Sequence, residues 1–263
     1  MASLEESPYP PDSGFDFVGL KNLRNDIYPA IDVSKSTNLQ QPGKVVLITG
    51  AGRGIGRSMA VQYARANVTT IVLCARTGSE LDEVEERIKE VNGDVKVRKE
   101  VLNVTDGAAV KDLAHRVEQE SGRLDILINN AGLSRPWEPV GDTNPPDYWQ
   151  VLEVNLHGPL LLTHAFLPLL VRTAGAHSTY VNIINVTSIG AVTLIPGGSS
   201  YALSKLALQK LGEYVAVEYG GKGINVVGIH PGGVATKLAN GIKEVKDCKL
   251  HTCDGHERAR ADS

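Results

Sequence analysis

The chain has 263 residues, a formal net charge of −3 and a pI near 6.2. This length allows one or two domains with a large buried core. The slightly acidic balance disfavours a broad nucleic-acid-binding face, which is usually basic. The three cysteines, Cys74, Cys248 and Cys253, are too few for a disulfide framework.

Residues 1–42 are rich in Pro, Asp, Ser and Asn and show no sustained periodicity, which predicts an irregular N-terminal extension. Its beginning, MASLEESPYPPDSGFD, lacks the basic and apolar regions of a signal peptide. The most apolar stretch of the chain, residues 159–171, is too short to span a bilayer. We therefore expect a cytoplasmic protein that binds neither membrane nor nucleic acid.

After residue 43 the sequence alternates between two patterns. Short apolar, β-branched runs predict buried strands at 44–50, 69–75, 94–104, 124–132, 179–188 and 224–232. Helical spacing predicts helices between them, at 57–66, 79–91, 107–121, about 145–173 and 201–219. This alternation predicts an α/β fold, a Rossmann-type doubly wound parallel sheet with helices on both faces. Such a sheet binds ligands at the carboxyl ends of its strands.

The segment TGAGRGIG (49–56) joins the first strand to the first helix. Gly50, Gly54 and Gly56 allow a tight turn and a close approach of the backbone to a pyrophosphate, whose charge then meets the helix N-terminus. A glycine trio alone also occurs in plain turns. A strand before it and a helix after it favour a dinucleotide site.

Further motifs follow in order: NNAG at 129–132, VNLHG at 154–158, Ser188, YALSK at 201–205 and PGGVAT at 231–236. With them the chain resembles the short-chain dehydrogenase/reductase family from about Gly43 to Thr236. The leader, with IYPAID at 27–32, is similar to extensions of fungal members. The resemblance implies hydride transfer between a nicotinamide cofactor and a ketone, aldehyde or alcohol, without a metal. A small carbonyl of secondary metabolism is the expected substrate, and residues 133–140, residues 189–199 and the short tail after Thr236 are expected to select it.

The end of the second strand distinguishes NAD from NADP, because a carboxylate there accepts the ribose 2′-OH and a cation binds a 2′-phosphate. The chain has Ala75 followed by Arg76, and Arg53 lies in the glycine turn. Two guanidinium groups can converge on one phosphate. The alternative is that both arginines are merely solvated surface residues. We predict NADP(H).

The resemblance assigns the other cofactor contacts. Asn103, where the family usually has Asp, and Val104 would border the adenine, and the NNAG residues would border the adenosine ribose. The complete expected set is Gly50, Arg53, Gly54, Ile55, Gly56, Arg76, Asn103, Val104, Asn129, Ala131, Gly132, Tyr201, Lys205, Pro231, Gly232, Val234 and Thr236.

Tyr201 and Lys205 stand at i and i+4 of a predicted helix and so share one face. A nearby ammonium, and the charge of an oxidised nicotinamide, would lower the pKa of the phenol and allow Tyr201 to act as general acid or base. By resemblance, Ser188 would stabilise the substrate oxygen and Asn155 would hold a water near the lysine. Each residue alone has an ordinary structural explanation, but together they predict a catalytic site.

Two other groups of residues carry less information. CKLHTCDGH (248–256) leaves little room for a closed metal site, so we expect none. Trp137 either lines the substrate cleft or serves packing or an interface.

The chain departs from the family after Thr236. Members continue with a helical lid, a helix and a seventh strand, whereas residues 237–263 show no buried-strand pattern. We expect an atypical short tail with the last strand missing, and at most a homodimer through the helices near 145–173 and 201–219. The domain boundaries are thus 1–42, 43–236 and 237–263. A non-catalytic NADP(H)-binding partner, or a truncated and weakly active member, is the alternative function.

Overall fold

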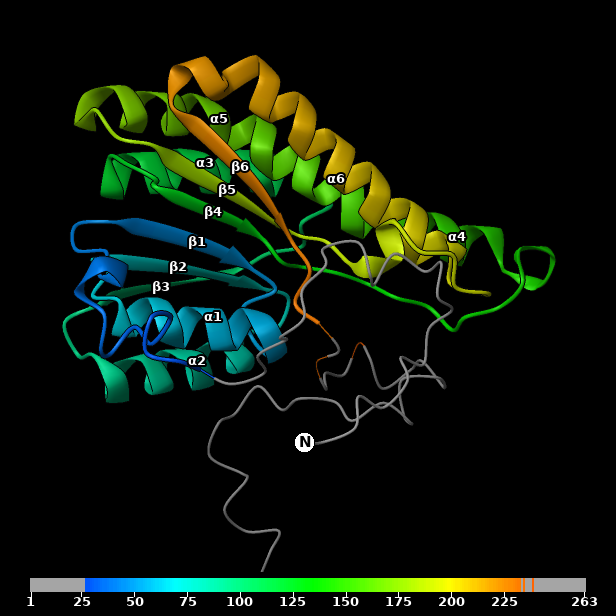
Figure 1. The fold of residues 1–263 in the computed structure, drawn as a ribbon, viewed down its shortest axis with the longest axis horizontal. Helices are drawn as coiled ribbons and strands as arrows, with labels where there is room; N and C mark the ends of the chain where they lie inside the picture. Colours follow the sequence, from blue (N-terminus) through cyan, green and yellow to red (C-terminus); the bar gives the residue numbers. More distant parts are fainter. Residues whose placement is uncertain (1–26, 233, 235–237, 239–263) are drawn as a thin grey trace, which may run out of the picture.

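A computed structural model describes residues 27–232, 234 and 238. Its centre is a six-stranded parallel sheet in the order β3-β2-β1-β4-β5-β6 (Figure 1). The strands are β1 (Val45–Thr49), β2 (Thr70–Ala75), β3 (Lys96–Val101), β4 (Ile126–Asn129), β5 (Val181–Val186) and β6 (Ile224–Ile229). The predicted fold class is confirmed. Several strands are shorter than predicted, since β3 and β4 lie inside the ranges 94–104 and 124–132.

The helices lie on both faces of this sheet (Figure 1). Helices α1 (Gly54–Arg65) and α2 (Gly78–Val91) cover one face, and α3 (Gly107–Ser121), α5 (Gly158–His177) and α6 (Ser199–Tyr219) cover the other. Helix α4 (Pro145–Leu152) precedes α5. This arrangement explains the unbroken apolar run of β1, because all five of its residues are buried between two helical layers.

The core consists of two apolar clusters, one on each side of the sheet. Leu47 and Leu127 point to the cluster that includes Phe166 of α5, whereas Val46 and Ile48 point to the cluster beneath α1 and α2. Neighbouring residues of one strand thus serve opposite faces, as the two-residue period of a strand requires.

The predicted helix at 145–173 is observed as a longer helical stretch. A π-helical turn, Glu153–His157, joins α4 to α5, and the whole stretch runs from Pro145 to His177. By length and composition it would suffice to cross a membrane, although the apolar run at 159–171 alone is too short. Its buried residues, including Leu162, Phe166 and Leu170, instead pack in the core with β4 and β5.

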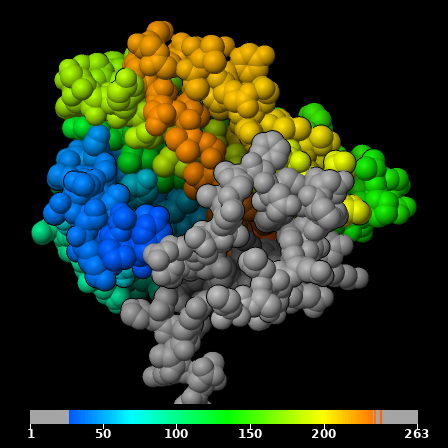
Figure 2. All heavy atoms as spheres, in the orientation of Figure 1, coloured from blue at the N-terminus to red at the C-terminus, as the bar shows by residue number. Residues whose placement is uncertain are grey.

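The leader is ordered where the structure describes it. In the described residues 27–43 the only helical element is a 3₁₀ turn, Thr37–Leu39, whereas residues 1–26 of the predicted extension lie outside the described residues. The Gln41 N–H donates to the carbonyl of Ala66, and the Gln40 side chain donates to the carbonyl of Arg65. This segment, deep blue in Figure 2, therefore lies against the end of α1. The tail predicted for 237–263 lies outside the described residues, apart from Leu238.

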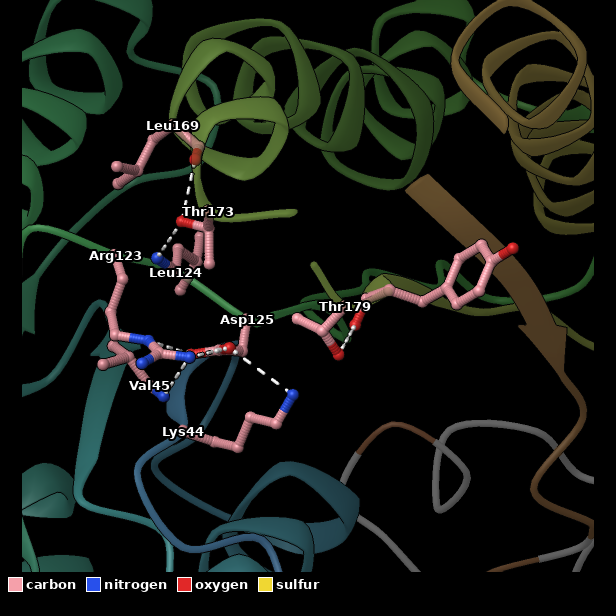
Figure 3. A network of polar contacts seen from close by, with 9 residues as sticks. Lys44, Val45, Arg123, Leu124, Asp125, Leu169, Thr173 and Thr179 are labelled. Atoms are coloured by element: carbon pink, nitrogen blue, oxygen red, sulfur yellow. Dashed lines mark hydrogen bonds and ion pairs between the residues drawn. The ribbon is translucent and has the colours of Figure 1, made fainter. Parts of the chain in front are cut away.

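A buried carboxylate connects the amino ends of β1 and β4 (Figure 3). Asp125, fully buried, accepts from the Val45 N–H at 2.8 Å and from Arg123 Nε and Nη2 at 2.9 and 2.6 Å. Lys44 Nζ lies 3.6 Å from the same carboxylate. Because all strands are parallel, this network stands at the edge of the sheet opposite the carboxyl ends.

Candidate active site

The glycine turn lies between β1 and α1, where the backbone passes very close to itself. Gly50 has φ +62°, in the left-handed region that favours glycine. A Cβ placed on Gly56 would lie 2.3 Å from the Gly50 carbonyl oxygen, so no side chain fits there. Arg53 caps α1 without any side-chain hydrogen bond to the first turn. The turn thus leaves the N–H groups of the α1 N-terminus to a ligand, which fits a pyrophosphate.

Asn130 fixes the end of β4 to this turn. Its Nδ2 donates to the carbonyls of Thr49 and Gly50 at 2.8 and 3.1 Å, and its N–H donates to Thr49 Oγ1 at 3.0 Å. Thr49 Oγ1 also accepts from the N–H of Ala131 at 3.1 Å. Asn130 and Thr49 were not predicted as positioning residues, although both belong to the motifs NNAG and TGAGRGIG.

Asn129, by contrast, turns its side chain into the core. It is 1% exposed, and its Nδ2 donates to Asn185 Oδ1 at 2.9 Å and to Thr163 Oγ1 at 3.5 Å. Its amide therefore links β4 to β5 and α5. A role in cofactor binding stays a prediction, and it would involve the backbone of Asn129, beside Ala131 and Gly132.

The end of β2 lies beside the glycine turn and the first turn of α2. Ala75 ends the strand, and the exposed Arg76 follows. Arg53 Nη1 donates to Oε1 of Glu80, a residue of the first turn of α2, at 2.9 Å. Arg76 was predicted at this end of the strand and Arg53 in the glycine turn, whereas Glu80 was not predicted to belong to the site.

The predicted catalytic residues lie together at the carboxyl end of β5. Ser188 follows this strand, and its Oγ accepts from the Gly190 N–H at 3.1 Å. The Tyr201 phenol is hydrogen-bonded to Ser188. Lys205, 3% exposed, places its Nζ 5.6 Å from the centre of the Tyr201 ring and donates to the Val186 carbonyl at 2.8 Å.

Burial dominates the electrostatics of this pair. Burial raises the pKa of Tyr201 above its ordinary value, while the hydrogen bond from Ser188 acts in the opposite direction. Burial also lowers the pKa of Lys205 from 10.5 to about 8. The sequence analysis expected a lowered tyrosine pKa. In this structure the pKa of Tyr201 is raised instead, because desolvation of the phenolate outweighs the hydrogen bond from Ser188.

Asn155 lies within the π-helical turn, fully buried. Its side chain donates to the Leu133 carbonyl at 2.9 Å and to Ser204 Oγ at 3.0 Å, and it accepts from the Leu133 N–H at 2.7 Å. It therefore holds the loop after β4 against α6, the helix of Tyr201 and Lys205. A π-turn at such a place is frequent at functional sites. The predicted water-holding role stays a prediction.

Two loops flank the catalytic residues. Trp137 packs on the turn before α6, where a Cβ on Gly198 would lie 3.5 Å from its ring, and the Glu138 N–H donates to the Gly197 carbonyl at 3.2 Å. Of the two alternatives for Trp137, a packing contact is thus observed. His230 Nδ1 accepts from the Ile189 N–H at 3.1 Å, beside Ser188. No role was predicted for His230, yet its side chain supports the loop after Ser188.

The remaining predicted cofactor residues lie at the same edge of the sheet. Asn103 follows β3, and a Cβ on Gly158 would lie 2.8 Å from Val104 Cγ2, so α5 begins directly on Val104. Pro231, Gly232 and Val234 follow β6. Thr236 lies outside the described residues. Their cofactor contacts stay predictions.

The buried ammonium of Lys205 predicts a pH-dependent stability difference in Lys205→Met. A pKa of about 8 in the fold, against 10.5 for an ordinary lysine, costs the wild type about 3 kcal/mol at neutral pH. Between these two values the unfolded chain binds more protons, so wild-type stability rises with pH in this window. Relative to Lys205→Met, we expect the wild-type free energy of unfolding to rise by about 3 kcal/mol between pH 7 and pH 10.5, measured with urea.

Lys210→Met is the control, the same change at an exposed position of α6. A hydrogen bond to Glu213 raises the pKa of Lys210, so this variant should not show the rise. A stability difference between wild type and Lys205→Met that stays constant from pH 7 to pH 10.5 would contradict the prediction.

Comparison with known proteins agrees with this geometry. The sequence profile of the short chain dehydrogenase family matches residues 44–247. A short chain dehydrogenase of Monascus purpureus is 40% identical over 247 residues, which cover 92% of this chain and 80% of that protein. The structure of a metagenomic short-chain oxidoreductase in complex with NADP is similar with a TM-score of 0.67 and 28% identity, covering 78% of this chain and 89% of the other.

The structure of an NAD⁺-bound xylitol dehydrogenase is also similar, with a TM-score of 0.67, 31% identity, and coverage of 74% of this chain and 72% of the other. Proteins with either nicotinamide cofactor thus share this fold. The chain belongs to the short chain dehydrogenase/reductase family, oxidoreductases that use NAD(P)(H) to interconvert carbonyl and alcohol groups.

Proposed function

We propose that this protein is an NADP(H)-dependent reductase of a small ketone or aldehyde, with Tyr201 as general acid and base. The observation that carries the proposal is the contact between Tyr201 and Ser188 at the carboxyl end of β5, with the buried Lys205 beside them. Proton donor, hydrogen-bond donor and cation converge where a doubly wound sheet binds its ligands.

Tyr201, Ser188 and Lys205 each have a separate role in the proposed reaction. In the reducing direction Tyr201 donates its phenolic proton to the carbonyl oxygen, and its raised pKa keeps that proton in place at neutral pH. The Ser188 oxygen accepts from the Gly190 N–H, and its one proton, which Tyr201 accepts in the absence of substrate, would turn to the substrate oxygen when the substrate binds. Lys205 then stabilises the tyrosinate, because with a pKa of about 8 its side chain is mostly protonated, and so positively charged, at pH 7.

The residues present fit a dinucleotide cofactor, which would supply the hydride. The uncapped N-terminus of α1 suits the pyrophosphate, and the tight turn before it requires a glycine at 56, where a Cβ would meet the Gly50 carbonyl. Arg53 and Arg76 at the end of β2 suit a 2′-phosphate, and Ala75 has no carboxylate to bind a 2′-OH. Asn155, hydrogen-bonded to Leu133 and Ser204, would hold the loop after β4 in place against α6.

The substrate is proposed to lie between the loop that carries Trp137 and the loop after Ser188. Val192 and Leu194 of the second loop are 63% and 100% exposed, which favours an apolar portion in the substrate. A substrate of secondary metabolism and a cytoplasmic location stay predictions. The similarity to a Monascus short chain dehydrogenase is compatible with the first.

The proposal is tested by following NADPH oxidation at 340 nm with a panel of ketones and aldehydes. Light scattering of the same sample measures the oligomeric state. Exposed apolar residues on α6, including Leu203, Leu206 and Val217, favour a homodimer through this helix. NADPH binding without turnover of any carbonyl would instead favour the non-catalytic alternative.

Arg76→Ala tests the cofactor preference. Because Arg76 would meet only the 2′-phosphate, the variant should bind NADPH about tenfold more weakly and NADH with unchanged affinity. Dissociation constants from the fluorescence of the bound reduced cofactors measure this. Arg87→Ala, at an exposed position of α2, is the control. Equal wild-type affinities for NADPH and NADH, or an unchanged preference in Arg76→Ala, would contradict NADP(H) specificity.

A further inference from the structure

Glu80 lies in the part of the site where the two nicotinamide cofactors differ. A Cβ built on Gly52 would stand 2.8 Å from both Cβ and Oε2 of Glu80 and 3.4 Å from Cβ of Ala75. The carboxylate therefore rests on the glycine turn, directly beside the end of β2. In a dinucleotide-binding sheet, this is the place of the ribose 2′ substituent.

Glu80 also engages the arginine that the cofactor would use. Its Oε1 lies 2.9 Å from Arg53 Nη1, and the Glu80 and Arg53 side chains are 24% and 48% exposed. The pair is thus reachable by solvent and by a ligand, and a 2′-phosphate arriving there would meet Arg53 already paired with a carboxylate.

The negative charge of Glu80 determines which of the two cofactors this arrangement disfavours. A phosphate monoester carries about −1.5 to −2 charges at neutral pH and is repelled by a carboxylate a few ångströms away. A ribose hydroxyl, in contrast, can donate a hydrogen bond to a carboxylate. Glu80 thus acts against NADPH and not against NADH, in opposition to Arg53 and Arg76.

We propose that Glu80 is a specificity-determining residue that weakens the binding of 2′-phosphorylated cofactors by competing for Arg53 and repelling the phosphate. This inference rests on the proposed function, since it presupposes an NADP(H) site at the end of β2.

The test is the Glu80→Gln variant, measured by binding alone. Dissociation constants of NADPH and NADH come from cofactor fluorescence, and those of adenosine 2′,5′-bisphosphate and AMP from calorimetry. NADPH and the bisphosphate should each bind about tenfold more tightly to the variant, with NADH and AMP unchanged or weaker. The gain should shrink at high salt, because the repulsion is screened. Glu83→Gln, at an exposed position of the same helix, should show no gain.

The outcomes separate this inference from the function it rests on. If the wild type binds NADH more tightly than NADPH, the proposed cofactor fails. If the wild type prefers NADPH and Glu80→Gln leaves that preference unchanged or weakens NADPH, only the role of Glu80 fails. A gain for NADPH without a gain for the bisphosphate also overturns it, since the effect would then not act at the 2′ position.

Discussion

Tyr201→Phe should lower the turnover of any carbonyl that the wild type reduces by about 10²–10⁴-fold, with NADPH bound as before. The substitution removes only the phenolic oxygen, and proton donation by a positioned side chain contributes about 10²–10⁴-fold. The ring stays in place beside the Lys205 ammonium, 5.6 Å from its centre, so the fold around the site should not change. Single-turnover rates and NADPH dissociation constants separate the chemical step from binding.

The control for this prediction is Tyr214→Phe, the same change at a 61% exposed position of the same helix. It should retain wild-type rates.

The pH dependence of the reverse reaction gives a second check, because alcohol oxidation needs the tyrosinate and burial raises the pKa of Tyr201. Oxidation by the wild type should therefore accelerate with rising pH where reduction does not. Near-wild-type reduction by Tyr201→Phe would remove Tyr201 from the mechanism.

The parallel α/β fold and the position of the site were predictable from sequence because they depend on periodicity. Buried parallel strands give continuous apolar runs such as Val45–Thr49, and helices between them fix the parallel direction. The carboxyl ends of β1, β4 and β5 then meet at one edge, which brings the glycine turn and Ser188 together. Tyr201 and Lys205 were predictable as neighbours because four residues make one helical turn.

Contacts between elements far apart in sequence were not predictable in this way. Glu80 and Arg53 are 27 residues apart, and nothing in either segment indicates that α2 begins beside the glycine turn. Asn129 and Asn130 are adjacent and identical, yet the alternation of a strand sends the first into the core and the second to Thr49. The direction of the Tyr201 pKa depends on burial, which the spacing of residues does not contain.

The second large effect concerns stability and the opposite edge of the sheet. Asp125→Asn should lower the free energy of unfolding by about 3 kcal/mol, because it leaves the Arg123 guanidinium facing an uncharged amide in a buried network. One acceptor oxygen also becomes a donor, and the Val45 N–H and Arg123 then compete for the oxygen that remains. Against a total of roughly 5–15 kcal/mol for a folded protein, such a loss is large.

The ties of Asp125 to three elements explain why the effect should be global. Its backbone N–H donates to the Val45 carbonyl of β1, and its own carbonyl accepts from the Asn182 N–H, next to the start of β5. The neighbouring Leu124 N–H donates to Thr173 of α5, which in turn donates to Leu169 (Figure 3). The carboxylate, which accepts from the Val45 N–H and from Arg123, therefore lies at the point where two sheet neighbours and a covering helix meet.

Urea unfolding of wild type and variant at pH 7 measures the loss, and Asp82→Asn is the matched control. Asp82 is paired with Lys99 at 2.6 Å, but its side chain is 61% exposed. An exposed ion pair contributes about 0–1 kcal/mol, so the same chemical change should have little effect there. Because Asp125 lies at the amino ends of the strands, the turnover of the folded variant should equal that of the wild type. A loss no greater than that of Asp82→Asn would mean that the buried charge contributes no net stability, since hydrophobic packing around β1 and β4 alone would then hold this edge.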